Sequence, residues 1–307
     1  MTDSQQSERS HSVLMPRHLI EPLGLFEPFF RQRVIEGQVR LSLSKVAMVG
    51  LARNCAAPLR ANLERVKTLG EKCRAWRFHC ETNDNTDATA EVLAEFCDKH
   101  PQASYRERTL NRQQFSAEFA GPRTIALAEY RTACQQWVRD HAADADYCIV
   151  IDLDAWGGWS LDGVFNSIGW LVELPGAYGM ASVSLFQHPA AVTDSEGVTK
   201  QVASWMHYDC WAMRGVGQAR TYWDDYTAGL GGWKYQWLPP VGSQPVLVSS
   251  AFGGMGIYRT EAFLAGAYDG AGDCEHVTYH ESIATATGRH LYLNPSQRCI
   301  MRWIDGG

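Results

Sequence analysis

The sequence predicts an α/β protein whose mixed, mainly parallel sheet is flanked by helices. The clearest observation is the continuous apolar segment from Val46 to Leu51, which is typical of a central strand buried on both faces. Further segments alternate between strand patterns, over 74–80 and 147–153, and helix patterns, over 58–69, 88–99 and 123–141. This alternation predicts parallel strands joined by right-handed crossovers, with ligands bound at the carboxyl ends of the strands.

The second half of the chain has shorter strand patterns, over 181–186, 208–214, 246–258 and 291–293, separated by loops such as the Trp- and Gly-rich stretch 215–245. Loops of this length often carry binding sites. We predict a tail and arm over 1–40, then one domain over 41–303 with two functional halves, 41–160 and 161–303. The apolar residues within 13–40 favour an arm packed on the domain over a membrane-surface or dimer contact.

Composition narrows the class of protein. The net charge is −6 and no basic stripe is evident, which argues against a nucleic-acid partner. The nine cysteines form no CxxC pair, which is typical of reduced thiols in the cytoplasm. The polar N-terminus has no apolar signal segment, so we expect a cytoplasmic protein, with peripheral association at the inner face of a membrane as a further expectation. The sequence does not indicate an oligomeric state.

The sharpest local pattern is a DxD motif, Asp152-Leu153-Asp154, at the end of an apolar strand. Alternate residues of a strand point the same way, so the two carboxylates should share one face. Their repulsion is relieved by a cation, and oxygen ligands suit Mg²⁺ or Mn²⁺. The alternative is a pair of solvated loop aspartates, because a lone DxD is weak evidence.

Two arginines upstream of the motif suggest a binding site for phosphate groups. Arg123 and Arg131 are eight residues apart on a predicted helix and so share one face. The guanidinium fork matches the oxygens of a diphosphate. For either arginine alone, an exposed charged helix face is the alternative.

At this point the sequence resembles a known family. The segments Val49 to Asn54, Glu81 to Asp84, Arg123 to Arg131 and Asp152 to Asp154 resemble the nucleotide-sugar half of a GT-A glycosyltransferase. They are similar to the fungal capsule-associated α-1,3-mannosyltransferase group and its bacterial relatives. Phe252 to Tyr258 and Cys274 to Val277 resemble the acceptor half of such enzymes.

The resemblance implies a metal-dependent hexosyltransferase of polysaccharide biosynthesis that uses a GDP- or UDP-sugar, retains the anomeric configuration and glycosylates a carbohydrate or lipid-linked glycan. It also implies roles for single positions: Ala52 and Arg53 beside the nucleoside, Glu81 on base or ribose, Asp152 on ribose or donor sugar, Asp154 on the metal, and Glu275 on a sugar hydroxyl.

Two departures from the family pattern concern histidines. Many members have an aspartate where this chain has His276, so His276 becomes a second catalytic candidate beside Glu275. Many also carry a late histidine as a metal ligand, which is missing from the stretch 296–301. His280, four residues after His276, is a candidate replacement, although a structural histidine is the more common outcome.

On the acceptor side, the candidates are Trp156, Trp211, Gly253 and Gly254. Aromatic faces stack on sugar rings, and glycines allow close approach of the backbone. For the tryptophans, packing is the alternative.

Two other functions compete with glycosyl transfer. A nucleotidyltransferase needs a Gly-rich basic loop after the first strand, and the loop Leu51 to Cys55 has one arginine and no glycine. A non-catalytic carbohydrate-binding protein of the same fold would bind sugar without a metal.

Overall fold

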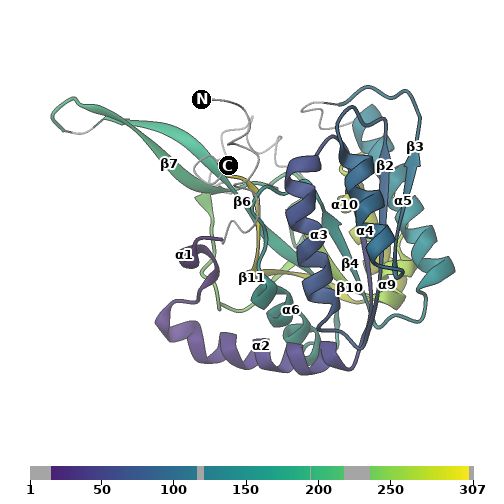
Figure 1. Ribbon diagram of the computed structural model, residues 1–307. Coiled ribbons are helices and arrows are strands. Elements are labelled where there is room, and N and C mark those ends of the chain that lie inside the picture. Colours follow the sequence, from purple (N-terminus) through teal and green to yellow (C-terminus); the bar gives the residue numbers. More distant parts are fainter. Residues whose placement is uncertain (1–14, 116–120, 194, 218–235, 304–307) are drawn as a thin grey trace.

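The computed structural model describes residues 15–115, 121–193, 195–217 and 236–303, and an eleven-stranded sheet runs through them (Figure 1). The strand order is β3-β2-β1-β4-β10-β6-β11-β9-β8, with β5 paired to β11 and β7 paired to β6. The strands are β1 (Lys45–Ala52), β2 (Ala75–Asn83), β3 (Ala103–Arg108), β4 (Tyr147–Asp152), β5 (Gly158–Trp159), β6 (Ala177–Thr193), β7 (Thr199–His207), β8 (Arg214–Gly215), β9 (Val246–Ser250), β10 (Met255–Arg259) and β11 (His290–Arg302).

The sheet is mixed and mainly parallel, which confirms the predicted fold class. Strands β1, β2, β3 and β4 pair in parallel, as do β6 and β11. Because β10 is antiparallel to both β4 and β6, these two groups point the same way. Only β5, β7, β9 and β10 oppose this direction among the strands described.

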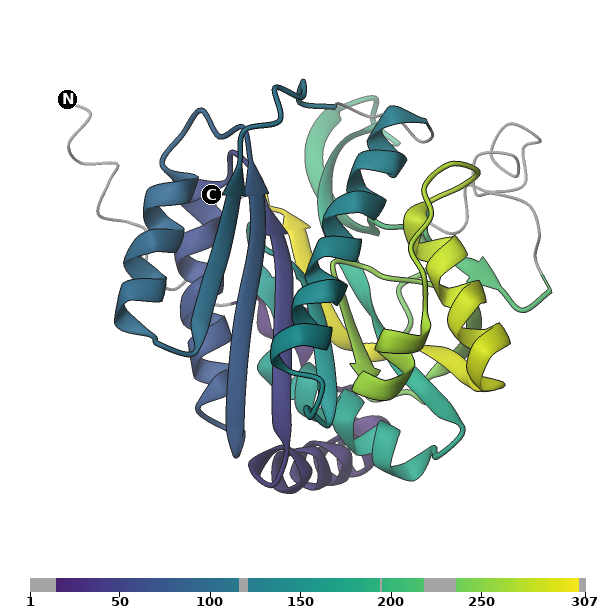
Figure 2. The ribbon, with the colours of Figure 1, turned by 90° about the vertical axis from the view of Figure 1, so that its right-hand side faces the viewer.

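Helices cover both faces of the sheet. They are α1 (Arg17–Ile20), the 3₁₀ turn η2 (Gly24–Phe26), α2 (Glu27–Ser42), α3 (Ala56–Gly70), α4 (Thr89–Lys99), α5 (Pro122–His141), α6 (Leu161–Glu173), α9 (Thr260–Ala265) and α10 (Glu275–Thr287). One core lies beneath α2, α3, α4 and α6, and the other lies beneath α5, α9 and α10, which face the viewer in Figure 2.

Strand β1 shows why the central strands have continuous apolar sequences. Val46 and Met48 belong to the first core, whereas Ala47 and Val49 belong to the second. All four side chains are buried. A strand covered on both faces needs apolar residues at every position, so the period-2 pattern of a half-exposed strand disappears.

The predicted elements of the first half are confirmed, but the prediction lacks two strands, β3 and the two-residue β5. β3, at the edge of the sheet, was not predicted because its sequence, ASYRER, is polar and mostly accessible to solvent. In the second half, the predicted strand 208–214 is wrong: these residues form a loop that leads to the two-residue strand β8. The segment 246–258 is two strands, β9 and β10, separated by a turn.

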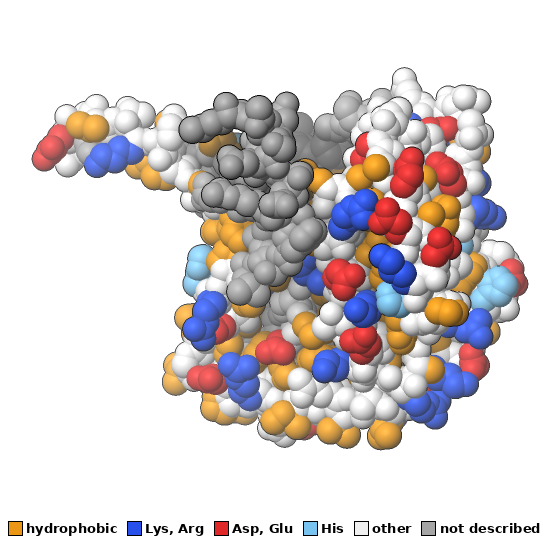
Figure 3. Space-filling model, in the orientation of Figure 1, with side chains coloured by type: hydrophobic (Ala, Val, Ile, Leu, Met, Phe, Trp, Pro, Cys, Tyr) orange, Lys and Arg blue, Asp and Glu red, His pale blue; other side chains and the backbone are white. Residues whose placement is uncertain are grey.

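Strands β6 and β7 form a long hairpin that projects from the body (Figures 1 and 3). Their pairing runs from Thr193 opposite Thr199 back to Leu185 opposite His207. The hairpin therefore returns the chain to the sheet at His207, which fixes where the loop after β7 begins. In the described ranges, no helix is long and apolar enough to cross a bilayer.

Helices α2 and α6 approach each other closely because two glycines face the opposite backbone. A Cβ on Gly37 of α2 would overlap the carbonyl oxygen of Phe165, and one on Gly169 of α6 would overlap the carbonyl of Arg33. Phe30, Val34 and Leu41 of α2 are buried in this contact region. The helix that precedes β1 is thus part of the first core.

This contact predicts a stability difference between two Gly→Ala substitutions. Gly37→Ala should lower the free energy of unfolding by about 2–3 kcal/mol, because the added methyl must push the helices apart. Gly176→Ala, at a position with open space around it, should leave stability unchanged or slightly raised. Urea unfolding of the two variants checks this, and equal midpoints would contradict the account of the helix contact.

Candidate active site

A cavity of about 670 Å³ opens at the carboxyl ends of β1, β2 and β4. Leu51, Ala52, Glu81, Asn83 and Asp152 line it from the ends of these strands. The opposite wall comes from α5, the loop after β7, the turn between β9 and β10, and the start of α10. The predicted loop ends therefore meet, as expected for an α/β sheet.

Arg131 of α5 binds two of the carboxylates that line the cavity. Its Nε donates to Glu275 Oε1 at 3.0 Å, its Nη2 donates to Asp152 Oδ1 at 3.1 Å, and its guanidinium stacks on Phe252 at 4.7 Å. Burial alone would lower the pKa of Arg131, but attraction to Asp152 and Glu275 outweighs it, so the pKa is raised. Nη1 has no hydrogen-bond partner among the described residues. Arg131 is thus a fixed cation that holds two carboxylates.

Asp152 and Asp154 differ in their surroundings although they come from one strand end. Asp152 is bound to Arg131, whereas Asp154 is exposed and no cation is paired with it in the described chain. Displacement of water by the surrounding protein and repulsion from Asp152 raise the pKa of Asp154 to about 6. The Asp154 carboxylate is therefore the one that gains most from a bound cation.

The described residues contain no group of three or more His, Cys, Asp or Glu side chains arranged to hold a metal ion. Two carboxylates facing one cavity still fit Mg²⁺ or Mn²⁺, which commonly keep water and substrate phosphate among their ligands. Asp154, with Asp152 beside it, would hold such an ion.

Glu81 is buried at the end of β2, and its carboxylate is surrounded by basic side chains. His79 lies 3.0 Å from its carboxylate, and Arg106 and Arg108 approach at 2.8 and 3.4 Å. Burial alone would raise the pKa of Glu81. The hydrogen bonds from His79 and Arg106 lower this pKa by more than burial raises it, so the net shift is downward. The Glu81 carboxylate thus forms a fixed anionic part of the cavity wall.

The loop beyond β3 closes the same side. Asp84 adopts a left-handed conformation, with φ +48°, and accepts backbone N–H groups of Leu110, Asn111 and Arg112. Burial opposes these hydrogen bonds, which together lower the pKa of Asp84 to about 2. Arg53 donates to the carbonyl oxygens of Arg112 and Gln113, so its guanidinium is bound to protein.

Arg123 and Trp211 meet across the cavity mouth. The guanidinium of Arg123 lies 5.5 Å from the Trp211 ring centroid, and both residues line the cavity. Unlike Arg131, Arg123 is only partly buried. Of the two predicted phosphate-binding arginines, it is the one with a solvent-accessible side chain.

At the start of α10, Glu275 and His276 both line the cavity and are buried. His276 stacks on Phe252 with ring centroids 3.8 Å apart, and its two ring nitrogens have no hydrogen-bond partner in the described part of the chain. Burial, together with the charge of Arg131, holds the pKa of His276 well below its ordinary value. His276 is therefore neutral and a weak base at pH 7.

His280 does not line the cavity, and its position gives no support to the predicted metal role. Its Nδ1 is 2.9 Å from Ser250 Oγ and its Nε2 is 2.9 Å from the Tyr258 hydroxyl. With both nitrogens in hydrogen bonds inside the second core, His280 is a packed structural histidine. His280 is inaccessible to solvent because it lies on the same face of α10 as His276 and Ile283, which are also buried.

Two further predictions for the acceptor side differ from the geometry. Trp156 is exposed but does not line the cavity. Gly253 is buried, with φ +66°, and a Cβ there would overlap the carbonyl oxygen of Ser182, so its requirement for glycine comes from packing. Gly254 does line the cavity, and its carbonyl accepts the backbone N–H of Asp152 at 2.9 Å.

Asp209 is a cavity residue that was not predicted from the sequence. It lies in the loop after β7, lines the cavity and is held by the backbone N–H groups of Gly253, at 2.9 Å, and Ala212, at 3.3 Å. Tyr208, which precedes it, also lines the cavity and is about half exposed. A lone aspartate between aromatic residues carries no recognisable spacing, so the sequence held no signal for it.

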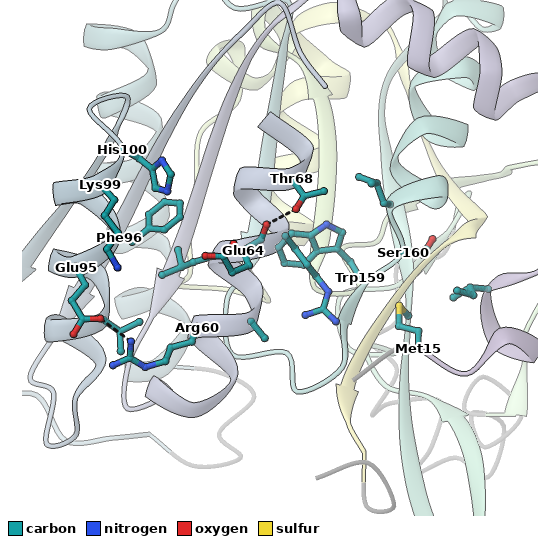
Figure 4. A pocket seen from close by; sticks show the side chains of 16 residues that line it. Met15, Arg60, Glu64, Thr68, Glu95, Phe96, Lys99, His100, Trp159 and Ser160 are labelled. Atoms are coloured by element: carbon teal, nitrogen blue, oxygen red, sulfur yellow. Dashed lines mark hydrogen bonds and ion pairs between the residues drawn. The ribbon is translucent and has the colours of Figure 1, made fainter. Parts of the chain in front are cut away.

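A second cavity, of about 660 Å³, lies between α3, α4 and β5 (Figure 4). Its acidic side chains are paired at the surface: Glu95 binds Arg60 at 2.8 Å, and Glu64 lies 3.7 Å from Lys67. It lacks a strand-end carboxylate pair, so the cavity at Asp152 and Asp154 is the candidate active site.

Comparison with known proteins gives structural likenesses only. No protein-family model and no curated protein sequence matches this chain. The mannosyltransferase PcManGT from Pyrobaculum calidifontis, in complex with GDP-Man and Mn²⁺, is 12% identical; the match covers 90% of this chain and 66% of that one, with a TM-score of 0.47. GalNAc-T7 with UDP, GalNAc and Mn²⁺ is 10% identical, with coverages of 94% and 55% and a TM-score of 0.48.

A third solved structure, the M. tuberculosis glucosyl-3-phosphoglycerate synthase, is 10% identical, with coverages of 88% and 76% and a TM-score of 0.46. This chain thus spans 66% and 55% of the first two structures. Likenesses at these TM-scores do not assign a function by themselves, so the function rests on the site.

The contrast between the two arginines predicts different effects of Arg131→Met and Arg123→Met. Arg131→Met leaves the buried Glu275 carboxylate and the partly buried Asp152 carboxylate unpaired, and should cost about 3–5 kcal/mol of stability. Arg123→Met should cost less than about 1 kcal/mol and weaken binding of a nucleoside diphosphate roughly tenfold, with nucleoside binding unchanged. Urea unfolding and calorimetric titration with UDP, GDP and their nucleosides measure both. Equal losses of stability would contradict the distinction.

The surroundings of Asp154 predict a pH-dependent gain from Asp154→Asn in the metal-free protein. The folded-state pKa, about 6, lies above the ordinary value of 3.8, so ionisation of Asp154 destabilises the fold as pH rises between these values. After a discount for its exposure, Asp154→Asn should gain about 1 kcal/mol, or about 2 °C in Tm, at pH 7.5. Near pH 4 the gain should vanish, because the carboxyl is then largely protonated when folded. Thermal unfolding with a chelator checks this, and a gain equal at both pH values would contradict it.

Proposed function

We propose that this chain is a GT-A-type glycosyltransferase that moves a hexose from a GDP- or UDP-sugar to a hydroxyl of a carbohydrate or lipid-linked glycan, assisted by Mn²⁺ or Mg²⁺. The observation that carries the proposal is the pair Asp152 and Asp154 at a strand end, facing one cavity, with Asp154 open and unneutralised. Such a pair is suited to a cation that also binds a diphosphate.

A cation at this place would supply positive charge to the leaving diphosphate. The contribution of the protein's own side chains is to hold charged groups in position. Arg131 keeps the Asp152 carboxylate in one orientation, and Arg123 offers a guanidinium at the cavity mouth that can approach phosphate oxygens. Fixed charges act strongly in such a site because they need not reorganise as the bond to the sugar breaks.

The two sides of the cavity suggest where each substrate binds. Ala52, Arg53 and Glu81 form the wall beside the ends of β1 and β2, where we place the nucleoside. Tyr208, Trp211 and Glu275 lie on the other wall, where we place the sugar acceptor. Aromatic rings bury the apolar faces of sugars, and a fixed carboxylate accepts hydrogen bonds from hydroxyl groups.

A nucleotidyltransferase is less well supported. It grips a triphosphate with a Gly-rich basic loop after the first strand. Here the basic residue of that loop, Arg53, donates to the carbonyl oxygens of Arg112 and Gln113. The assignment to the fungal capsule-associated group, the cytoplasmic location and the domain division of the chain stay predictions. Retention of configuration, which the sequence resemblance implies, is tested by the anomeric configuration of the product.

The direct test is turnover of a panel of UDP-, GDP- and dTDP-sugars with a mixture of glycan acceptors and Mn²⁺. We expect release of one free nucleoside diphosphate that stops with a chelator and falls at least about 100-fold in Asp154→Ala, a loss typical of electrostatic groups at an active site. Asp98→Ala, an exposed aspartate on α4, is the matched control and should keep full activity.

Other outcomes of this test would contradict the proposed function or its metal assignment. Pyrophosphate release would indicate a nucleotidyltransferase. Sugar binding with no nucleotide release would indicate a carbohydrate-binding protein. Near-normal turnover in a well-folded Asp154→Ala variant would contradict the metal assignment.

A further inference from the structure

Glycosyl transfer to a hydroxyl requires a destination for the hydroxyl proton. The acceptor is a poor nucleophile until that proton leaves, so an enzyme that works by direct displacement positions a general base against it. A carboxylate serves best in this role when no cation already stabilises its negative charge. The acidic residues of the cavity can be compared on this basis.

Most of these acidic side chains are already paired with arginine or histidine side chains. Glu81 is bound by His79, Arg106 and Arg108. Asp152 and Glu275 share the guanidinium of Arg131. Each of these carboxylates therefore already has a cation within hydrogen-bond or ion-pair distance.

The other two candidates are also unsuitable. His276 is neutral, with a pKa held well below its ordinary value by burial and by Arg131. Asp154 is the carboxylate that we assign to the cation, which would compete with a proton for the same oxygens.

Asp209 differs from all of them. It lines the cavity, and no lysine, arginine or histidine pairs with it in the described chain. Its donors are the neutral N–H groups of Gly253 and Ala212. Burial raises the pKa of Asp209, the two backbone hydrogen bonds oppose this, and the charges of Asp152 and Glu275 raise it further, with a net upward shift.

The backbone around Asp209 fixes its carboxylate. Asp209 Oδ2 accepts the N–H of Gly253, while Gly254, the next residue, accepts the N–H of Asp152 through its carbonyl. The glycine turn between β9 and β10 therefore ties Asp209 to the strand end that carries the DxD motif. Tyr208 and Trp211, on either side in the sequence, supply the aromatic surface on which an acceptor sugar can lie.

We propose, on the basis of the proposed glycosyl transfer, that Asp209 is the general base that deprotonates the acceptor hydroxyl. The acceptor oxygen forms its bond to the anomeric carbon as the bond from that carbon to the diphosphate oxygen breaks. The electron pair of the broken bond stays on the diphosphate, and the hydroxyl proton moves to the Asp209 carboxylate and then to water. A single displacement inverts the anomeric configuration, opposite to the retention implied by the sequence resemblance.

The test compares Asp209→Asn with the wild-type protein in three measurements: transfer to hydroxyl acceptors, affinity for the nucleoside diphosphate with Mn²⁺, and nucleotide release with azide as acceptor. Azide needs no deprotonation. We expect transfer to hydroxyls to fall at least about 100-fold, as for loss of a general base. Nucleotide affinity should stay within about twofold, and azide-dependent release should match wild type, since neither depends on the base.

Two controls separate catalysis from folding. Asp269→Asn changes an aspartate that likewise accepts a backbone N–H, from Ala271 at 2.8 Å, but lies outside the cavity, and it should retain full activity. Asp209→Glu restores a carboxylate and should recover part of the lost rate.

The anomeric configuration of the wild-type product, read by NMR coupling constants, should be inverted. A retained product would overturn the assignment, as would Asp209→Asn with near-normal transfer or with lost nucleotide binding. A wild-type protein that binds nucleotide diphosphate but transfers no sugar would instead overturn the proposed function, and this assignment with it.

Discussion

The arrangement of this site depends on one buried cation. Arg131 is almost inaccessible, and burial of a guanidinium is costly unless carboxylates and hydrogen bonds offset it. Asp152, at the end of β4, and Glu275, at the start of α10, provide that compensation. Because α5 carries the arginine, the start of α10 is held beside α5 and the end of β4 in the wall of the cavity.

The pairing of Arg131 with Asp152 and Glu275 gives the acidic residues of the cavity different surroundings. Asp152 and Glu275 are oriented and neutralised by Arg131, while Asp154, two residues further along, keeps an open carboxylate with a raised pKa. Asp209, on the opposite wall, is held only by neutral backbone groups. These four of the five carboxylates in the cavity lining thus have three different environments, which is how neighbouring acids acquire different chemical tasks.

The strands that could be predicted most easily from the sequence are those that are buried on both faces. β1 and β4 lie at the centre of the sheet and are buried on both faces, so their apolar sequences identify them directly. β3 and β7 are edge strands with many exposed positions, and their polar sequences resemble loops. The segment 208–214 has the opposite problem: Ala212 and Met213 are buried in a loop, so their hydrophobicity suggested a strand that does not form.

The site was predictable where chemistry follows from local spacing. Asp152 and Asp154 both line the cavity, as their spacing predicts, although β4 ends at Asp152 and Asp154 lies in the turn that follows. Arg123 and Arg131 line it together because they are eight residues apart on a helix. The pairing of Arg131 with Glu275 joins residues 144 apart, and no local pattern encodes it. The same holds for Asp209, whose position depends on a turn 44 residues further along the chain.

The proposed function requires that Asp152 and Asp154 bind a nucleoside diphosphate through a divalent cation. The most direct measurement is anomalous X-ray diffraction from crystals grown with Mn²⁺ and either UDP or GDP. We expect one strong manganese peak in the cavity, within bonding distance of an Asp154 carboxylate oxygen and of the diphosphate. A nucleotide bound elsewhere, or bound in this cavity with no manganese peak beside Asp154, would contradict it.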